Sequence, residues 1–294
     1  MLKKVQISGV VCLKVNIKLA KFIEDKIKID KWTPDVIVGY MKTHNYFELD
    51  GFESITTPTI YAAIRYHIID VKLEDTRKIK YKQKYEYHKS DLPEAKAEYS
   101  INNRQKEIDK RLYFEHFELD TVIGTKKGKH ECLMTLTEQK TRFEIIFKLK
   151  GKTSEEGVNK FNKMKEFMKN NYNKIFKSIT TDNDSEFSDF LNIIKSTKTK
   201  IYFCHPYCSE KKVTNERHNG IIRYFIPKGT PIENYSCKDV NKIAEWMNNY
   251  PRKILNHKNP LETIQEEFYN KSILNKIYKL QEKINYLFQF PFDR

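Results

Sequence analysis

The sequence predicts an α/β fold, with a mixed five-stranded sheet and flanking helices, preceded by a small helical region. Three strand-like runs joined by short turns occupy the middle of the chain, and two further strand-like runs then alternate with helical patterns. Two helix-start signals also occur before residue 70. Because the chain has 294 residues, of which 39% are hydrophobic, it is long enough to bury a sizeable core.

Two short helices are predicted in the first 70 residues. Thr33 and Pro34 open the first helix, with Thr at the N-cap and Pro at the first helical position, and Thr57 and Pro58 open the second in the same way. The pair is a helix-turn-helix candidate, although any small helical hairpin has the same pattern. In a DNA-binding unit the second helix would enter the groove, and its candidate contacts are Thr59, Tyr61 and Arg65.

Residues 71–112 form a polar stretch in which lysines are interleaved with tyrosines. Such a stretch suits a strap along a DNA backbone, and a solvated linker is its commoner explanation. Either interpretation makes it a domain boundary. We therefore expect a partial helical DNA-binding region at 1–70, a basic linker at 71–112, a core domain at 113–268 and a helical tail at 269–294.

The core domain is expected to contain five strands. The first three, joined by short turns, form an antiparallel meander. The last two alternate with helices and are therefore parallel, since their connections must cross over the sheet. This order is the ribonuclease-H-like plan. The predicted strands are 117–123, 133–137, 143–149, 179–182 and 200–204, and the predicted helices are 154–174 and 187–195.

Three acidic residues fall where this plan places a metal site. Asp120 lies inside the first strand, Asp182 ends the fourth, and Glu216 opens the helix after the fifth. The first and fourth strands are neighbours in such a sheet, so the two aspartates should meet. An Asp within an apolar strand is costly unless it is paired or binds a metal. Carboxylates suit Mg²⁺, and two such ions would stabilise both oxygens of an in-line phosphoryl displacement.

Composition favours a polyanionic partner. The chain has 54 Lys and Arg against 39 Asp and Glu, a formal net charge of +15, although lysine-rich composition accounts for part of this excess. No apolar run approaches the length of a membrane-spanning helix. The five cysteines are irregularly spaced and do not suggest a disulfide framework. We expect a cytoplasmic protein, associated with the nucleoid when bound to DNA.

Five motifs, in order within residues 32–268, carry a family resemblance. They are FELDTVIG at 117–124, TDNDSEF at 181–187, HPYCS at 205–209, TNERHNGIIR at 214–223 and NNYPRK at 248–253. Together they resemble the transposases of the insertion sequence thirty family. Thirty-three residues separate Asp182 from Glu216, which is the interval that this family shows between its second Asp and its Glu.

The resemblance implies a DDE transposase with a retroviral-integrase-like catalytic core. Asp120, Asp182 and Glu216 would be the catalytic metal ligands, with Mg²⁺ as cofactor and Mn²⁺ as a possible substitute. Such enzymes cut double-stranded DNA at terminal inverted repeats and join the freed end to target DNA. Strand exchange between two ends implies a homodimer or larger assembly. Further candidate DNA contacts are Asn219 and Arg223, which share a helix face with Glu216, and Arg252 and Lys253 in the last motif.

Three departures from the family pattern support an alternative. Asp184 stands where the family usually has Gly, and Lys212 with Val213 replaces an Arg-Gly pair. Residues 1–31 are expected to be too short and irregular for the family's first DNA-binding unit, as in a truncated copy. The alternative function is therefore a decayed or truncated transposase that binds DNA ends without cutting. Residues 273–287 carry a short heptad seam, for which docking on the core is favoured over a dimer zipper.

Overall fold

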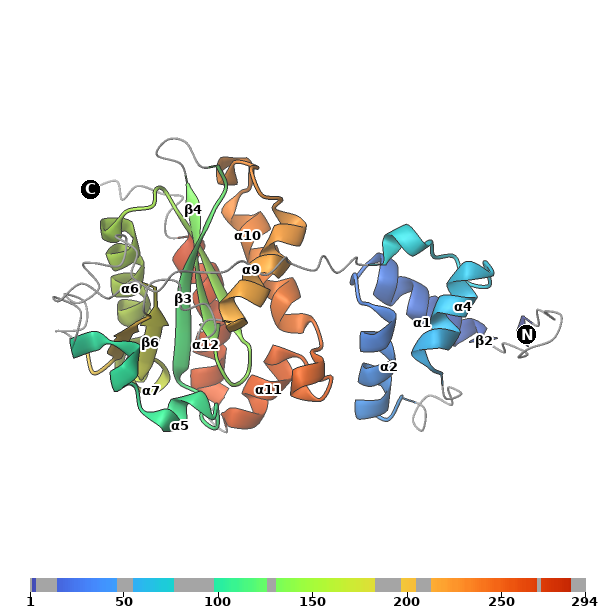
Figure 1. The fold of residues 1–294 in the computed structure, drawn as a ribbon, viewed down its shortest axis with the longest axis horizontal. Helices are drawn as coiled ribbons and strands as arrows, with labels where there is room; N and C mark the ends of the chain where they lie inside the picture. Colours follow the sequence, from blue (N-terminus) through green and yellow to red (C-terminus); the bar gives the residue numbers. More distant parts are fainter. Residues whose placement is uncertain are drawn as a thin grey trace. The chain divides into compact units, whose positions relative to one another are not determined.

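The computed structural model describes residues 2–3, 15–46, 55–76, 98–125, 131–182, 197–204, 213–268 and 271–286. The chain divides into two compact units (Figure 1). The first comprises residues 1–84 with 249–260, and the second comprises residues 85–248 with 261–294. The four-part division expected from the sequence stays a prediction.

The described residues of the first unit form the helices α1 (Ile17–Lys28), α2 (Pro34–Thr43) and α4 (Thr57–Arg65). Thr33 is the N-cap residue of α2 with Pro at the next position, as predicted, although its side chain makes no capping hydrogen bond. The predicted cap of α4 is one residue too late, because Thr56 is the N-cap and its hydroxyl accepts a hydrogen bond from Thr59 N at 3.4 Å. Two adjacent threonines before the proline offer two possible caps, and sequence spacing does not choose between them.

Helix α1 lies within residues 1–31, so this segment is more regular than expected, and whether it lacks the family's first DNA-binding unit stays a prediction. Leu19, Ile23 and Ile27 recur every four residues and are all buried. Lys18 and Lys21 lie on the exposed side of the same helix. A four-residue apolar spacing with lysines between is an amphipathic helix.

The second unit is built on a five-stranded sheet. Its strands are β3 (His116–Ile123), β4 (Cys132–Glu138), β5 (Glu144–Leu149), β6 (Ser178–Thr181) and β7 (Lys200–Phe203). They lie in the order β5-β4-β3-β6-β7, with β3, β4 and β5 antiparallel and β6 and β7 parallel to β3. The predicted ribonuclease-H-like sheet is confirmed, with strand ends within one residue of expectation. The predicted helix at 187–195 lies outside the described residues.

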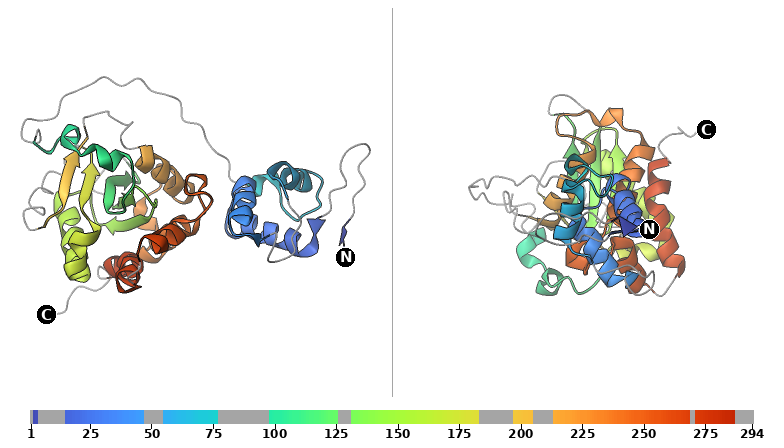
Figure 2. Two further views of the ribbon diagram at one scale, coloured as in Figure 1. Left: turned by 90° about the horizontal axis from the view of Figure 1, so that it is seen from below. Right: turned by 90° about the vertical axis from the view of Figure 1, so that its right-hand side faces the viewer.

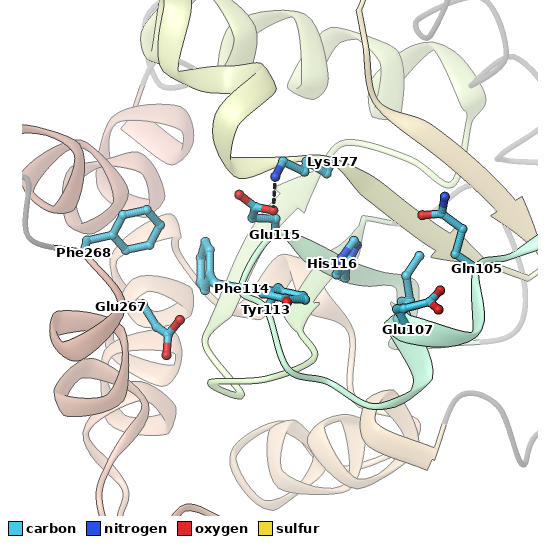
Figure 3. A pocket seen from close by; sticks show the side chains of 10 residues that line it. Gln105, Glu107, Tyr113, Phe114, Glu115, His116, Lys177, Glu267 and Phe268 are labelled. Atoms are coloured by element: carbon cyan, nitrogen blue, oxygen red, sulfur yellow. Dashed lines mark ion pairs between the residues drawn. The ribbon is translucent and has the colours of Figure 1, made fainter.

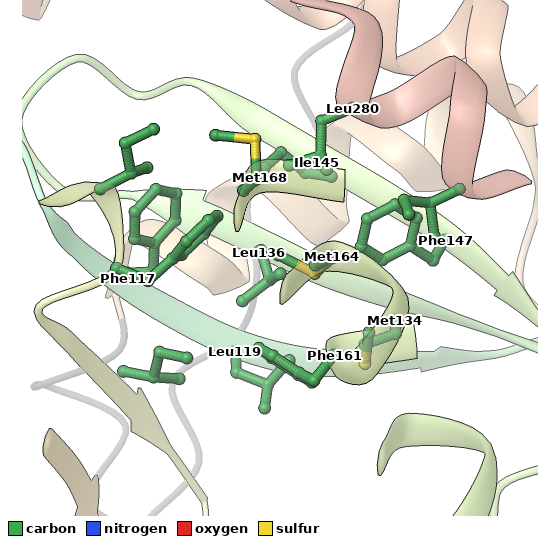
Figure 4. Close-up of a cluster of buried hydrophobic side chains, with 14 of the residues drawn as sticks. Phe117, Leu119, Met134, Leu136, Ile145, Phe147, Phe161, Met164, Met168 and Leu280 are labelled. Carbon is green, nitrogen blue, oxygen red and sulfur yellow. The ribbon is translucent and has the colours of Figure 1, made fainter. Parts of the chain in front are cut away.

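One face of the sheet carries the larger core. Side chains at alternate positions, such as Phe117 and Leu119, pack against α6 (Ser154–Met168), as Figure 4 shows. Thr153 caps α6 by accepting from Glu156 N at 3.3 Å. α7 (Tyr172–Ile175), α11 (Pro260–Glu267) and α12 (Lys271–Tyr286) add further residues to this core. The opposite face is covered over β3 and β4 by α9 (Val213–Phe225) and α10 (Cys237–Asn249).

Helix α12 lies beside α6 and along β5 (Figures 1 and 2). The heptad residues Ile277, Leu280 and Ile284 are buried in the larger core. The tail therefore docks on the core, which is the arrangement that the sequence favoured over a dimer zipper. The remaining short elements are η1 (Leu73–Asp75), η3 (Ile101–Asn103), α5 (Lys106–Asp109), η4 (Lys169–Asn171), η7 (Ile232–Asn234), η8 (Lys253–Leu255) and the strand pair β1 (Leu2–Lys3) with β2 (Val15–Asn16).

Candidate active site

The pairing of β3 with β6 aligns the two predicted aspartates. His116, Phe117 and Glu118 pair with Ser178, Ile179 and Thr180 in parallel register. Continuing the same register by two residues sets Asp120 opposite Asp182, which directly follows β6. Side chains two residues apart on a strand share a face, so Asp120 projects from the face of β3 that carries Glu118. Both aspartates are half-buried.

Helix α9 packs against β3 and contacts Asp120. Asn219 Nδ2 donates to Asp120 Oδ2 at 2.7 Å, and the second carboxylate oxygen of Asp120 accepts from Thr121 N at 2.9 Å. Four residues further along α9, Arg223 Nη2 donates to the carbonyl oxygen of Ile123 at 2.5 Å. Burial lowers the pKa of Arg223 from its usual value. Asn219 and Arg223 thus contact the strand that carries Asp120, while their predicted contacts with DNA remain predictions.

Glu216 lies in the first half of α9, three residues before Asn219. Its side chain is outside the described set, as are Asp184 and the motif at 205–209. Among the residues that the structure describes, no three His, Cys, Asp or Glu side chains gather into a metal-binding group. The catalytic and metal-ligand roles of Asp120, Asp182 and Glu216 therefore remain predictions.

The donors near Asp120 fit a hard divalent cation. The side-chain oxygen of Asn219 is buried and has no hydrogen-bond partner among the described residues. Its amide nitrogen faces the carboxylate of Asp120, which leaves the oxygen as a spare neutral ligand or water acceptor. Carboxylate and amide oxygens are the ligand types that Mg²⁺ accepts while it keeps several waters.

Charged groups beneath α9 are buried and were missed by the sequence analysis. Glu118 is 1% exposed and accepts from Asn215 N at 3.1 Å. Glu144 is fully buried and contacts His218 of α9. The alternation of side chains along a strand could have identified Glu118, because it lies two residues before Asp120 and therefore on the same face of the strand. Glu144 could have been identified because it opens a strand of mostly apolar residues.

A buried cation accompanies these acids. Arg142, in the turn before β5, is 6% exposed. Burial lowers its pKa to about 10, and the charges of Glu118 and Glu138 act in the opposite direction. The sheet face under α9 is therefore polar near Asp120, and it becomes apolar further along the helix, where Ile222 packs against Val122 and Leu133.

The predicted DNA contacts in the first unit differ in exposure. Arg65 is exposed, Tyr61 is half-buried with its pKa raised by burial, and Thr59 is half-buried within 2.7 Å of the hydroxyl of Thr56. Arg252 and Lys253 lie in the 249–260 segment, which belongs to the same compact unit. Five of the seven predicted DNA contacts thus lie in the first unit, and Asn219 and Arg223 lie in the second.

A pocket of about 570 Å³ lies at the other end of β3 from Asp120 (Figure 3). It contains the Glu115–Lys177 ion pair, at 2.5 Å, beside His116. Burial and the charge of Lys177 lower the pKa of His116 to about 4, so this imidazole is neutral at pH 7. None of the predicted site residues lines the pocket, whose walls are Gln105, Glu107, Ile108, Tyr113, Phe114, Glu115, His116, Lys177, Glu267 and Phe268.

The fold is a ribonuclease-H-like core in which Asp120 lies within β3 and Asp182 directly follows the adjacent parallel strand β6. No family model matches the chain. Several curated proteins are similar to it in sequence. The transposase InsI of insertion sequence element IS30C from Escherichia coli strain K12 is 29% identical over 259 residues, which cover 85% of this chain and 65% of the relative. The transposase of element IS4351 from Bacteroides fragilis is 30% identical over 173 residues, covering 59% of this chain and 51% of the relative.

The chain is thus a homologue of the IS30 transposases, and the resemblance stated from its motifs is confirmed. It spans about 65% of the length of the IS30 relatives. Among solved structures, the catalytic core domain of the HTLV-2 integrase in complex with magnesium aligns with a TM-score of 0.37 and 17% identity, covering 51% of this chain and 97% of that chain. No helix in the described part of the chain is long and apolar enough to cross a membrane.

Proposed function

We propose that this chain is a DNA transposase, a polynucleotidyl transferase that cuts DNA at the inverted repeats of an insertion sequence and joins the freed end to target DNA. The observation that supports this most is the parallel pairing of β3 with β6, whose register, continued by two residues, sets Asp120 opposite Asp182, together with the bond of Asn219 to Asp120. The homology to IS30 transposases supports the same activity. The likeness includes the segment that holds Glu216, at the family's interval from Asp182.

In this proposal Asp120, Asp182 and Glu216 hold Mg²⁺, for which Mn²⁺ substitutes. The bound ions would supply Lewis-acid stabilisation of the attacking and leaving oxygens at the scissile phosphate. The chain's own residues supply orientation. Asn219 holds one carboxylate oxygen of Asp120, and the Thr121 amide holds the other. Glu118 anchors the first turn of α9 through Asn215 N.

The proposed partner is double-stranded DNA, both the inverted repeats and the target. A formal charge of +15 supplies long-range attraction to the phosphate backbone. Arg65 and Lys253 are exposed cations of the first unit and are the candidate contacts there. Two ends must meet for strand exchange, so the working state would be a homodimer or larger assembly, acting in the cytoplasm on nucleoid DNA.

A cleavage and strand-transfer assay on the element's own ends tests this function. The wild type, with Mg²⁺ or Mn²⁺, should give joined product, and Asp182→Asn should reduce it by at least about a thousandfold because one metal-binding carboxylate is lost. Asp25→Asn, the same change on an exposed aspartate of α1, is the matched control and should keep full activity.

The assay also separates the binding-only alternative. A folded wild-type protein that shifts end DNA in a gel but gives no joined product with either metal would contradict the catalytic proposal. That result would favour a decayed copy that occupies the ends. Cutting without preference for the ends would instead point to a general nuclease on the same core.

A further inference from the structure

Helix α9 docks on the sheet by two different kinds of contact. Its second half packs mainly through apolar side chains, with Ile221 and Ile222 buried in the smaller core and Phe225 packed against it. The described contacts of its first half are polar. Asn215 N bonds to Glu118, His218 bonds to Glu144, and Asn219 bonds to Asp120. Position 216 lies within this polar half.

The contact between His218 and Glu144 is the most deeply buried of these. Both residues are at most 2% exposed. His218 Nδ1 donates to Glu144 Oε2, and the same oxygen accepts from the hydroxyl of Thr137 at 2.7 Å. Burying a carboxylate and an imidazole costs solvation energy, and apolar side chains of similar volume would dock the helix at lower cost.

The strand end that carries Glu144 is held from a second direction. Asn248, at the end of α10, accepts from Glu144 N at 2.8 Å and donates to Glu144 O at 2.8 Å. The main chain of Glu144 is thereby fixed while its side chain holds His218. A hydrogen bond of defined direction restricts rotation and sliding of a helix, whereas apolar contact is non-directional.

We propose that Glu144 and His218 are positioning residues, which fix the rotation of the first half of α9 and so set position 216 relative to Asp120. This inference rests on the proposed function, because it concerns the same site. The apolar contacts of the second half of α9 hold the helix against the sheet. The polar contacts of the first half set the rotation of the helix and its position along the sheet. The pair touches neither substrate nor metal and acts through the helix.

The first test compares the same substitution at two buried glutamates of the sheet. Glu144→Gln weakens the bond to His218, because a neutral acceptor binds a donor less strongly than a carboxylate. Glu138→Gln is the control, since Glu138 is equally buried but its described bonds go to Lys140 and Thr141 of its own turn. In the full chain, amides of the first half of α9 should exchange with solvent about threefold to tenfold faster in Glu144→Gln and at the wild-type rate in Glu138→Gln.

The second test removes both partners and measures Mn²⁺ binding by electron paramagnetic resonance, without DNA. The double variant Glu144→Leu with His218→Leu leaves neither charged group unpaired but removes the acceptor of the Thr137 hydroxyl, so the protein should remain folded with a free energy of unfolding lower by about 1–3 kcal/mol. Its Mn²⁺ affinity should fall about tenfold or more. The single variant His218→Asn keeps a donor at the equivalent position. Its Mn²⁺ affinity should therefore stay within about threefold of the wild-type affinity.

The outcomes separate this inference from the proposed function. Unchanged exchange in Glu144→Gln, or wild-type Mn²⁺ affinity in a folded double variant, overturns the positioning role. If the double variant does not fold, the Glu144→Gln and Glu138→Gln comparison decides alone. If the wild type neither binds Mn²⁺ nor joins DNA, the proposed function fails, and the exchange rates still decide whether the pair positions α9.

Discussion

Glu138 is a fully buried carboxyl group at the end of β4, next to the turn that leads to β5. Its Oε2 accepts from Thr141 N at 2.6 Å, from the Thr141 hydroxyl at 2.8 Å and from Lys140 N at 2.9 Å. Burial raises its pKa to about 7, and these hydrogen bonds act in the opposite direction. The folded state therefore holds a proton that the unfolded state has already lost at pH 5 to 7.

Stability should consequently fall as the pH rises through this window. Between the unfolded pKa of about 4.5 and the folded pKa of about 7, the native state binds more protons, so the free energy of unfolding decreases with pH and levels off above 7. The total decrease is on the order of 3 kcal/mol. Urea unfolding of the wild type at pH 5 and pH 8 measures it. Glu138→Gln should flatten the difference, and an equal slope in both proteins would contradict this assignment.

Asn219 supports a second prediction about a single residue. Asn219→Ala removes the donor at 2.7 Å from Asp120 and should lower strand transfer about tenfold with little change in melting temperature. Gly220→Ala is the control on the same helix, because a Cβ there would meet no atom within 4 Å. Strand-transfer rates of the two variants provide the comparison. Loss of activity in both, or in neither, would argue against a specific role for the Asn219 amide.

Carboxamide side chains cover the outer edge of β5. Asn248 bonds the main chain of Glu144 on both sides, and Gln281 of α12 does the same at Ile146. Asn285 accepts from Lys148 N at 3.2 Å and donates to Ile146 O at 3.0 Å. These amides satisfy groups that a further strand would otherwise pair with. An exposed strand edge invites pairing with other chains, so α12 protects the sheet as well as its core.

Replacing Asn285 by Leu should therefore destabilise the second unit. The change leaves Lys148 N without this acceptor in a buried position, which costs about 1–3 kcal/mol. Asn275→Leu, at an exposed position of the same helix, should change stability by less than about 0.5 kcal/mol. Chemical denaturation of both variants measures the difference. Equal stabilities would show that the amide cap on β5 is dispensable.

At the scale of the whole molecule, the chain contributes to the first unit twice. The 249–260 segment packs on α2, where Thr43 Oγ1 donates to Asn256 O at 2.7 Å and Thr33 Oγ1 lies 3.4 Å from the hydroxyl of Tyr250. Gly39 allows the imidazole ring of His257 to approach, because a Cβ on Gly39 would lie 2.0 Å from that ring. A segment far along the sequence thus completes the helical unit.

Gly39→Ala should displace this segment from α2. Trypsin should then cleave at Arg252, Lys253 or Lys258 at least about tenfold faster than in the wild type, because local opening exposes the backbone. The double variant Gly39→Ala with His257→Ala removes the clash and should restore resistance. If the double variant is still cleaved fast, the ring of His257 is not the group that requires glycine at position 39.

The strands of the second unit and their directions could be predicted from the sequence alone, whereas the meeting of Asp120 with Asp182 stays a prediction. Period-two runs mark each strand, and the short or helical connections require antiparallel or parallel pairing. Once β3 and β6 are neighbours, the positions of the two aspartates within their strands set the alignment. The motifs that these residues belong to also identified the relatives. All of this information is local along the chain.

Only the tertiary structure decided which buried groups meet. Nothing in the sequence pairs Glu144 with His218, 74 residues later, or lays Asn285 on the edge of β5, 137 residues after Lys148. It likewise decided that the 249–260 segment completes the first unit. The physical reason is that periodicity tells which side of an element is buried, whereas the partner of a buried polar group depends on how separate elements pack.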